Sequence, residues 1–367
     1  MALRQASQTL PLSVRSSIAR TRVNYVQLGR SGLRVSNPIL GCMGFGDPKW
    51  LGWTLAKEQA MHILNAAYER GVNTWDTANA YSNGTSERII GEALRQNRIQ
   101  RRKVVIMTKC YRPIADDDDP ATFVPLLDKE LSQSKDYVNQ YGLSRRAIIE
   151  SVNGSLERLR TDYIDLLQIH RFDSTVPPEE IMETLHDLIK SGKVRYIGAS
   201  SMWAYQFSIL QHTAERNGWT KFISMQNHYN LLYREEEREM NKFCKETNVG
   251  LIPWSPLAMG RLARPLTEDC STLRSTVDRI GKRFPIGESS EDQEIIRRVH
   301  SIAEKRSWSA SNVALAWINN RVTAPVIGVS SVGKLDACLE ARGKVLTEEE
   351  QRFLEEPYVP KAVYGHE

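Results

Sequence analysis

The chain has 367 residues, of which 41% are hydrophobic and 25% charged, and its formal net charge at pH 7 is +5. These proportions are typical of a soluble globular protein, and no apolar run reaches the roughly 18 residues of a membrane-spanning helix. No long basic run indicates a nucleic-acid partner. The five cysteines are scattered without a Cys-x-x-Cys pair, so the sequence predicts neither a disulfide framework nor a metal site. This cysteine usage favours a reducing compartment, and we expect a cytoplasmic protein.

The two ends of the chain differ from its middle. Residues 1–30 contain five arginines and several serines but no acid, and the first carboxylate is Asp47. This composition resembles an organellar targeting segment, although Pro11 would interrupt a helix there. Two interpretations of residues 1–23 therefore stay open, a disordered extension, which we favour, and mitochondrial targeting. We expect residues 359–367 to form a C-terminal tail.

Residues 25–29 and 33–36 predict a short β-hairpin around an Arg-Ser-Gly turn. From residue 39 onward, short apolar strands alternate with helices. The predicted strands are 39–44, 72–77, 104–109, 163–170, 194–200, 222–226, 250–254 and 324–328. The predicted helices are about 57–70, 86–96, 144–159, 178–190, 203–216, 234–247, 290–306, 309–320, 331–341 and 347–356. Two irregular segments remain, at 111–143 and 257–290.

This order of elements defines the expected fold class. Apolar strands without polar alternation are typical of a parallel sheet that is covered on both faces. Eight strand–helix units in about 300 residues favour a (β/α)8 TIM barrel over a doubly wound sheet. We therefore predict a single α/β domain over residues 24–358, with an N-terminal hairpin and extra helices and loops.

Polar side chains recur where the predicted strands end. Asp76 and Tyr81 follow the second strand, Lys109 ends the third and His170 ends the fourth. The carboxyl ends of barrel strands converge on one mouth, where such enzymes place their chemistry. Taken one at a time, such residues are more often a core histidine, a structural ion pair and a packing tyrosine. The other strand ends carry Ser200, Ser201, Gln226, Trp254, Ser330 and Lys334.

The sequence around these positions resembles the aldo-keto reductase superfamily, from about residue 24 to residue 345. It is most similar to the branch of fungal aryl-alcohol dehydrogenases and versiconal hemiacetal acetate reductase. The resemblance implies a barrel that binds NADPH in an extended form and reduces aldehydes and ketones. Consistent with this, no G-x-G-x-x-G follows a strand. The stretches that carry the resemblance are 75–81 (WDTANAY), 108–109 (TK), 166–170 (LLQIH), 197–201 (IGASS), 253–257 (PWSPL) and 326–330 (VIGVS).

The resemblance also implies catalytic roles that agree with elementary chemistry. Reduction of a carbonyl needs a hydride on carbon and a proton on oxygen. Tyr81 would be the general acid in reduction and the general base in oxidation. Lys109 would lower the pKa of the phenol by roughly 1–3 units, and Asp76 would pair with Lys109. His170 would orient the carbonyl or assist proton transfer.

Further residues are implied to hold the cofactor, NADPH or NADP+. Trp254 would stack on the nicotinamide, the alternative being a core tryptophan, and Gln226 and Ser200 would hold the carboxamide. Arg261 would reach the pyrophosphate, although a surface arginine is an equally good interpretation. Lys334, at a helix N-terminus suited to phosphate, would bind the adenosine 2′-phosphate. The full implied set is Gly44, Ser200, Ser201, Gln226, Trp254, Ser255, Leu257, Arg261, Gly328, Ser330 and Lys334.

The expected substrate is a small carbonyl or alcohol. The irregular segments, with the aromatic residues Phe45, Trp50, Tyr111 and Trp203, would wall a pocket for a bulky aromatic or polyketide-type compound. Two alternatives stay open. The same residues would serve an alcohol dehydrogenase working toward oxidation, and the same barrel occurs in NADPH-binding regulatory subunits resembling the potassium-channel β-subunits. The sequence does not determine the oligomeric state.

Overall fold

The computed structural model describes residues 10–116, 119–125, 127–266, 272–278, 281 and 286–366. The predictions for residues 1–9 and for parts of the two irregular segments therefore lie outside the described residues.

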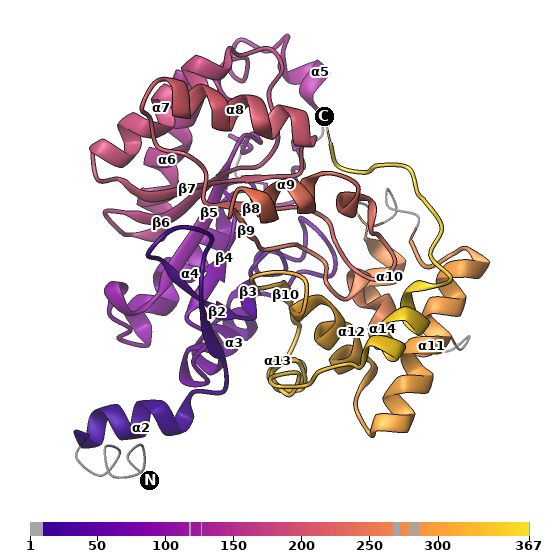
Figure 1. The fold of residues 1–367 in the computed structure, drawn as a ribbon. Helices are drawn as coiled ribbons and strands as arrows, with labels where there is room; N and C mark the ends of the chain where they lie inside the picture. The colour runs from indigo at the N-terminus through magenta and orange to yellow at the C-terminus, as the bar shows by residue number, and fades with distance from the viewer. Residues whose placement is uncertain are drawn as a thin grey trace.

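Eight parallel strands form one sheet at the centre of the molecule, with helices around it (Figure 1). Their order in the sheet is β10-β3-β4-β5-β6-β7-β8-β9. This arrangement confirms the (β/α)8 barrel. The strands are β3 (Ile39–Gly41), β4 (Thr74–Asp76), β5 (Val105–Cys110), β6 (Ile164–Ile169), β7 (Val194–Ser200), β8 (Ser224–Gln226), β9 (Gly250–Leu251) and β10 (Val326–Gly328).

The barrel closes between β9 and β10 through the residues that follow β9. Trp254 forms parallel bridges with both His228 and Val326. The Val326 amide donates to the Pro253 carbonyl at 2.9 Å, and the Thr323 amide donates to Leu251 at 2.9 Å. The predicted strand 250–254 is regular only over β9, because Pro253 has no N–H to offer a ladder.

The surrounding helices agree with the predicted ones within a few residues. Ser144 accepts a hydrogen bond from the Ala147 amide at the start of its helix, and Pro178 opens the next one. None of the helices in the described ranges is long and apolar enough to cross a membrane. The longer helices are α3 (Lys57–Glu69), α4 (Thr85–Gln96), α6 (Arg145–Leu159), α7 (Pro178–Lys190), α8 (Ala204–Arg216), α11 (Ser290–Arg306), α12 (Ala310–Asn319), α13 (Val332–Leu339) and α14 (Glu348–Glu355).

Shorter helical pieces occupy the connections. The predicted helix 234–247 is interrupted and consists of the 3-10 turn η2 (Glu235–Glu237) followed by α9 (Met240–Glu246). The remaining pieces are η1 (Arg101–Lys103), α5 (Asp128–Leu131), η3 (Ala258–Ala263) and α10 (Leu273–Val277).

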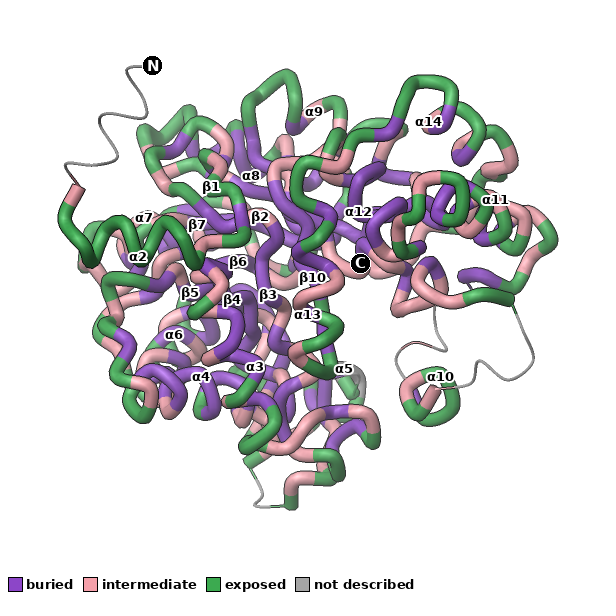
Figure 2. Tube along the Cα trace, turned by 90° about the horizontal axis from the view of Figure 1, so that it is seen from below, coloured by how far each residue is buried: buried purple, intermediate pink, exposed green. Residues whose placement is uncertain are grey.

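The core has two layers because side chains alternate along each strand. Trp75 packs outward with the helices, whereas Met107 and Leu166 belong to a smaller cluster inside the barrel. The hairpin of β1 (Asn24–Gln27) and β2 (Arg34–Asn37) adds fully buried residues to this inner cluster. It covers the end of the barrel where the strands begin, so polar side chains can gather at the opposite end. Figure 2 shows the buried centre within an exposed outer surface.

The N-terminal segment forms helix α2 (Leu12–Arg20), which has no buried residues and projects from the barrel (Figure 1). Both interpretations of residues 1–23, the disordered extension and the targeting segment, stay predictions. Pro11 does not interrupt the helix but immediately precedes it, where its fixed φ and missing N–H cause no loss.

Candidate active site

Two oppositely charged side chains meet at the ends of neighbouring strands. In the β4–β5 register Asp76 lies opposite Met107, so Lys109, two residues further along β5, faces the same interior. The Lys109 Nζ atom lies 2.6 Å from Asp76 Oδ2. The exposed fractions are 2% for Asp76 and 1% for Lys109, so each charge depends on the other for compensation.

The remaining hydrogen-bonding capacity of this pair is also satisfied. Lys109 Nζ donates to the Thr77 carbonyl at 2.8 Å. Asp76 Oδ1 accepts from Gln168 Nε2 and from Gln226 Nε2, both at 2.9 Å. Sequence reasoning missed Gln168. Its signal is its place in β6, two residues before His170 and therefore on the same face of the strand.

Tyr81 reaches the pair from the loop that follows β4. Its hydroxyl lies 3.5 Å from Lys109 Nζ. The next three residues, Ser82, Asn83 and Gly84, all have left-handed φ angles between 49° and 81°. Ser82 Oγ accepts from the Asp47 amide at 2.8 Å, which ties this loop to the one after β3. The tight turn therefore presents the phenol to the ammonium.

His170 completes the group at the end of β6. Its ring lies edge-on to that of Tyr81, with centroids 5.9 Å apart and an interplanar angle of 80°. The neighbouring Arg171 donates to the His170 carbonyl at 2.6 Å. The structure therefore brings all four residues proposed as catalytic into one cluster at the mouth of the barrel.

The electrostatics of the cluster follow from its burial. Burial raises the pKa of Tyr81 above its ordinary value of 10.0, and this effect exceeds the opposing influence of Lys109. The net shift of the Tyr81 pKa is thus upward, although Lys109 by itself lowers this pKa as expected. Burial disfavours the Lys109 ammonium, but Asp76 and then Tyr81 more than offset this, so its pKa is raised. Burial, together with nearby Arg171, holds the pKa of His170 well below 6.5. At neutral pH the phenol keeps its proton, the ammonium is charged and the imidazole is neutral.

The residues expected near the nicotinamide form a connected layer beside the cluster. Trp254 Nε1 donates to Ser201 Oγ at 3.1 Å, and Ser200 Oγ donates to the Gln226 carbonyl at 2.7 Å. The Gln226 amide nitrogen donates to Asp76 Oδ1, and the contact of Gln226 with a carboxamide stays a prediction. Sequence reasoning missed His228, whose ring stacks on Trp254.

The loop after β9 has an unusual backbone. Ser255, Ala258, Met259 and Gly260 all have positive φ, between 48° and 92°. Side chains rarely adopt this conformation without a structural or functional reason. Leu257 lies within this stretch. The Arg261 guanidinium lies 3.3 Å from Glu288 Oε1, so the structure gives it an ionic partner within the protein.

The stretch from β10 to the first turn of α13 contains several exposed residues and one lysine. Gly328 is exposed, and a Cβ atom there would meet no atom of the described residues within 4 Å. Lys334 Nζ donates to Ser330 Oγ at 2.7 Å, and Ser331 caps the helix. A helix N-terminus with a nearby lysine suits a phosphate group. Gly44 lies in the loop after β3, the strand that pairs with β10. Its carbonyl accepts a hydrogen bond from the Leu55 amide at 2.7 Å.

Two of the four aromatic residues expected to wall the pocket are instead buried. Phe45 and Trp50 have exposed fractions of 0% and 2%, and Trp50 packs against Phe123 with ring centroids 5.3 Å apart. Large aromatic rings near a mouth contribute as much to packing as to binding. Tyr111 is half-buried, whereas Trp203 is 41% exposed.

Comparison with known proteins agrees with this fold and cluster. A model of the aldo/keto reductase family matches residues 39–357. The chain belongs to the aldo-keto reductase family and is an oxidoreductase. Carbonyl reduction is the reaction that this membership supports, with small carbonyl or alcohol compounds as substrates.

Its relatives include several fungal enzymes. An aldo-keto reductase of Metarhizium robertsii is 58% identical over 359 residues, which cover 97% of each chain. Versiconal hemiacetal acetate reductase of Aspergillus parasiticus is 49% identical, covering 94% of this chain and 100% of the relative. A putative aryl-alcohol dehydrogenase of Schizosaccharomyces pombe is 46% identical, covering 93% of this chain and 97% of the relative.

Proposed function

We propose that the chain is an NADPH-dependent reductase of an aromatic or other bulky aldehyde or ketone, with Tyr81 as the proton donor. The observation that carries this proposal is the buried Asp76–Lys109 pair, 2.6 Å apart, with the Tyr81 hydroxyl 3.5 Å from the same ammonium. A protonated phenol held against a fixed cation suits delivery of a proton to a carbonyl oxygen.

Each member of the cluster then has a distinct task. Tyr81 releases its proton to the carbonyl oxygen, and Lys109 stabilises the phenolate that results. Asp76 keeps Lys109 in place and charged. Neutral His170, edge-on to Tyr81, orients the carbonyl oxygen beside the phenol.

The chain also offers groups that fit NADPH, which supplies the hydride when it is bound. Lys334 and Ser330 at the start of α13 suit the 2′-phosphate. The left-handed backbone after β9 suits the pyrophosphate, because unusual φ angles cluster at ligand sites. Trp254 offers an aromatic platform for the nicotinamide beside Ser201.

The names of the relatives support the substrate class. One relative is named for the reduction of versiconal hemiacetal acetate and another for aryl alcohols. We therefore propose an aromatic or polyketide-type carbonyl for this chain, reduced to the alcohol.

The decisive experiment compares wild type with Tyr81→Phe. Purified protein is mixed with NADPH and 4-nitrobenzaldehyde or a similar carbonyl panel, and loss of NADPH absorbance is followed. We expect wild type to turn over and Tyr81→Phe to be slower by roughly 100-fold or more, as for loss of a general acid. Tyr205→Phe, at a residue of α8 that is 62% exposed, is the matched control. Equal rates in wild type and Tyr81→Phe would refute the role of Tyr81.

We also propose that the protein acts in the cytoplasm, with mitochondrial import by residues 1–23 as the alternative. The scattered cysteines support a reducing compartment, and the four described ones are free and buried. Detection of the untagged protein in cytosolic and mitochondrial fractions distinguishes the two.

A further inference from the structure

Trp254 is one member of a stack of rings. Its indole lies on the imidazole of His228 with centroids 4.1 Å apart and an interplanar angle of 7°. His228 in turn lies on the ring of Tyr233, at 4.4 Å and 13°. The exposed fractions of His228 and Tyr233 are 1% and 0%, so the stack extends from the mouth into the protein interior.

The middle ring of the stack, that of His228, is held in place by Asn230. Asn230 Oδ1 accepts from the Leu232 amide at 2.9 Å, so the Asn230 amide nitrogen faces the other way. That nitrogen lies 3.1 Å from His228 Nε2 and donates to the Ser255 carbonyl at 2.9 Å. Burial lowers the pKa of His228 to about 3, so the ring is neutral and stacks without the cost of a buried charge.

The C-terminal segment closes the inner end of the stack. It runs from α14 across the molecule, yellow in Figure 1, and its last described residue, His366, contacts the Trp203 ring at the start of α8. The Tyr364 amide donates to the Tyr233 hydroxyl at 3.1 Å, and the two rings lie 6.0 Å apart. His366 Nε2 lies 2.9 Å from the buried carboxylate of Glu236.

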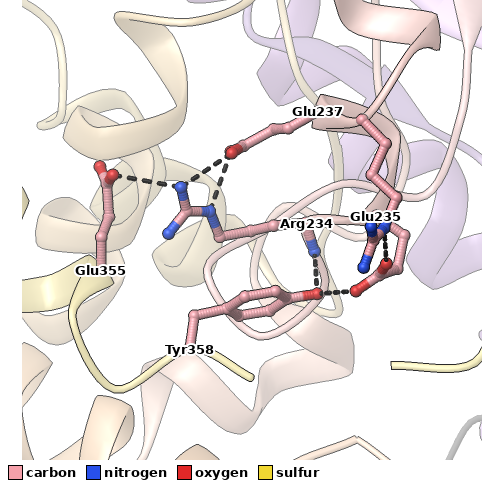
Figure 3. Close-up of a pocket in the computed structure, with 6 residues that line it drawn as sticks. Arg234, Glu235, Glu237, Glu355 and Tyr358 are labelled. Carbon is pink, nitrogen blue, oxygen red and sulfur yellow. Dashed lines mark hydrogen bonds and ion pairs between the residues drawn. The ribbon is translucent and has the colours of Figure 1, made fainter. Parts of the chain in front are cut away.

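A second group of contacts anchors the start of this segment. The Tyr358 hydroxyl donates to Glu235 Oε1 at 2.6 Å and accepts from the Arg234 amide at 2.8 Å (Figure 3). A cavity of about 280 Å³ lies among these residues. The Arg234 guanidinium is paired with both Glu237 and Glu355, so the charges of this cavity serve to dock the segment.

We infer that His228 and Tyr233 are positioning residues that fix the plane of Trp254 for the nicotinamide, and that the docked C-terminal segment completes this support through Tyr364. The inference rests on the proposed function, since it assigns a support to the platform of that same site. Because His228 covers one face of the Trp254 ring, the opposite face is the one that a nicotinamide would use. Disorder in the stack should therefore weaken the binding of the nicotinamide end of the cofactor. The binding of the adenosine end should be unaffected.

The test compares two ligands by isothermal titration calorimetry, NADPH and 2′,5′-ADP, which lacks the nicotinamide. We expect His228→Ala to bind NADPH about threefold to tenfold more weakly, the scale of one aromatic stacking contact, with unchanged affinity for 2′,5′-ADP. His228→Phe keeps an aromatic ring and restores NADPH affinity toward wild type. His212→Ala, at an exposed histidine of α8, is the matched control.

Tyr364→Ala tests the C-terminal segment and serves if His228→Ala does not fold. We expect the same selective loss of NADPH affinity to a smaller degree. Equal weakening of both ligands, or unchanged NADPH affinity in both variants, overturns the inference. A wild-type protein that binds neither ligand instead contradicts the proposed cofactor. The two failures are therefore distinguishable.

Discussion

At the scale of single residues, the protonation states of the cluster set its expected pH dependence. Burial raises the pKa of Tyr81, so the donor keeps its proton at every pH below that raised value. Burial and nearby cations lower the pKa of His170, so the imidazole stays neutral at every pH above its lowered value. Neither group changes its charge near neutral pH.

We therefore expect kcat/KM for carbonyl reduction to show no inflection near pH 6.5, where an ordinary histidine would titrate. The rate falls only on the alkaline side, when Tyr81 loses the proton that it must donate. Initial rates at saturating NADPH across a set of overlapping buffers measure this. An inflection near pH 6.5 that disappears in His170→Gln would show that the histidine is not neutral.

The four cluster residues were predictable from sequence because each one ends or follows a strand of a recognisable barrel. The hydrogen-bond partners of Asp76 were harder to predict from the sequence. Gln168 was detectable only through its spacing from His170, and the contact of Gln226 with Asp76 depends on packing across the barrel. The pKa of Tyr81 could not be predicted, because its direction depends on how far burial exceeds the influence of Lys109.

At the scale of elements, the close approach of β7 and β8 depends on a glycine. A Cβ atom at Gly198 would lie 2.3 Å from Ser224 Oγ, well inside van der Waals contact. Ser224 Oγ has no hydrogen-bond partner among the described residues, so its removal loses little. The pair lies one layer beneath Ser200 and Gln226, so it supports the floor of the candidate site.

We expect Gly198→Ala to lower the free energy of unfolding by about 1–3 kcal/mol, the usual cost of overpacking. The double variant Gly198→Ala/Ser224→Ala makes room for the added methyl group and recovers part of this loss. Urea unfolding of the single and double variants measures the coupling. Additive effects of the two substitutions would mean that this contact does not limit the approach of the strands.

Local patterns predicted most helices because their capping residues are also local, such as Ser144 ahead of α6. The prediction of a helix over 234–247 was wrong for its first turns. The cause is a set of long-range contacts that the local sequence does not indicate. Glu235 accepts from Tyr358 and from the Lys361 amide, and Glu236 contacts His366. The carboxylates of the predicted charged helix instead bind a segment more than a hundred residues away in the sequence.

At the scale of the whole molecule, the proposed cofactor connects distant parts of the barrel. Lys334 follows β10, Trp254 follows β9, and the Asp76–Lys109 pair spans β4 and β5. A ligand that binds all of these points only in the folded state stabilises the entire fold.

We therefore expect NADPH to raise the melting temperature, since a ligand at 100 times its Kd contributes about 2.7 kcal/mol. NADH at the same concentration should raise it less, because it lacks the 2′-phosphate. Lys334→Ala should remove most of this difference, whereas Lys242→Ala, at an exposed lysine of α9, should not. Differential scanning fluorimetry measures all three proteins. A difference that persists in Lys334→Ala would assign the 2′-phosphate to another residue.

The course of the C-terminal segment has a practical consequence for work with this protein. A Cβ atom at Gly365 would lie 4.0 Å from the Trp254 ring and 3.7 Å from an Arg171 nitrogen, so this part of the C-terminal segment lies beside the mouth of the barrel. The N-terminal helix α2 projects away from the barrel with no buried residue (Figure 1). An affinity tag at the C-terminus would crowd the entrance to the site, whereas a tag ahead of α2 leaves the entrance clear. Recombinant protein for the activity, binding and stability assays above is best tagged at its N-terminus.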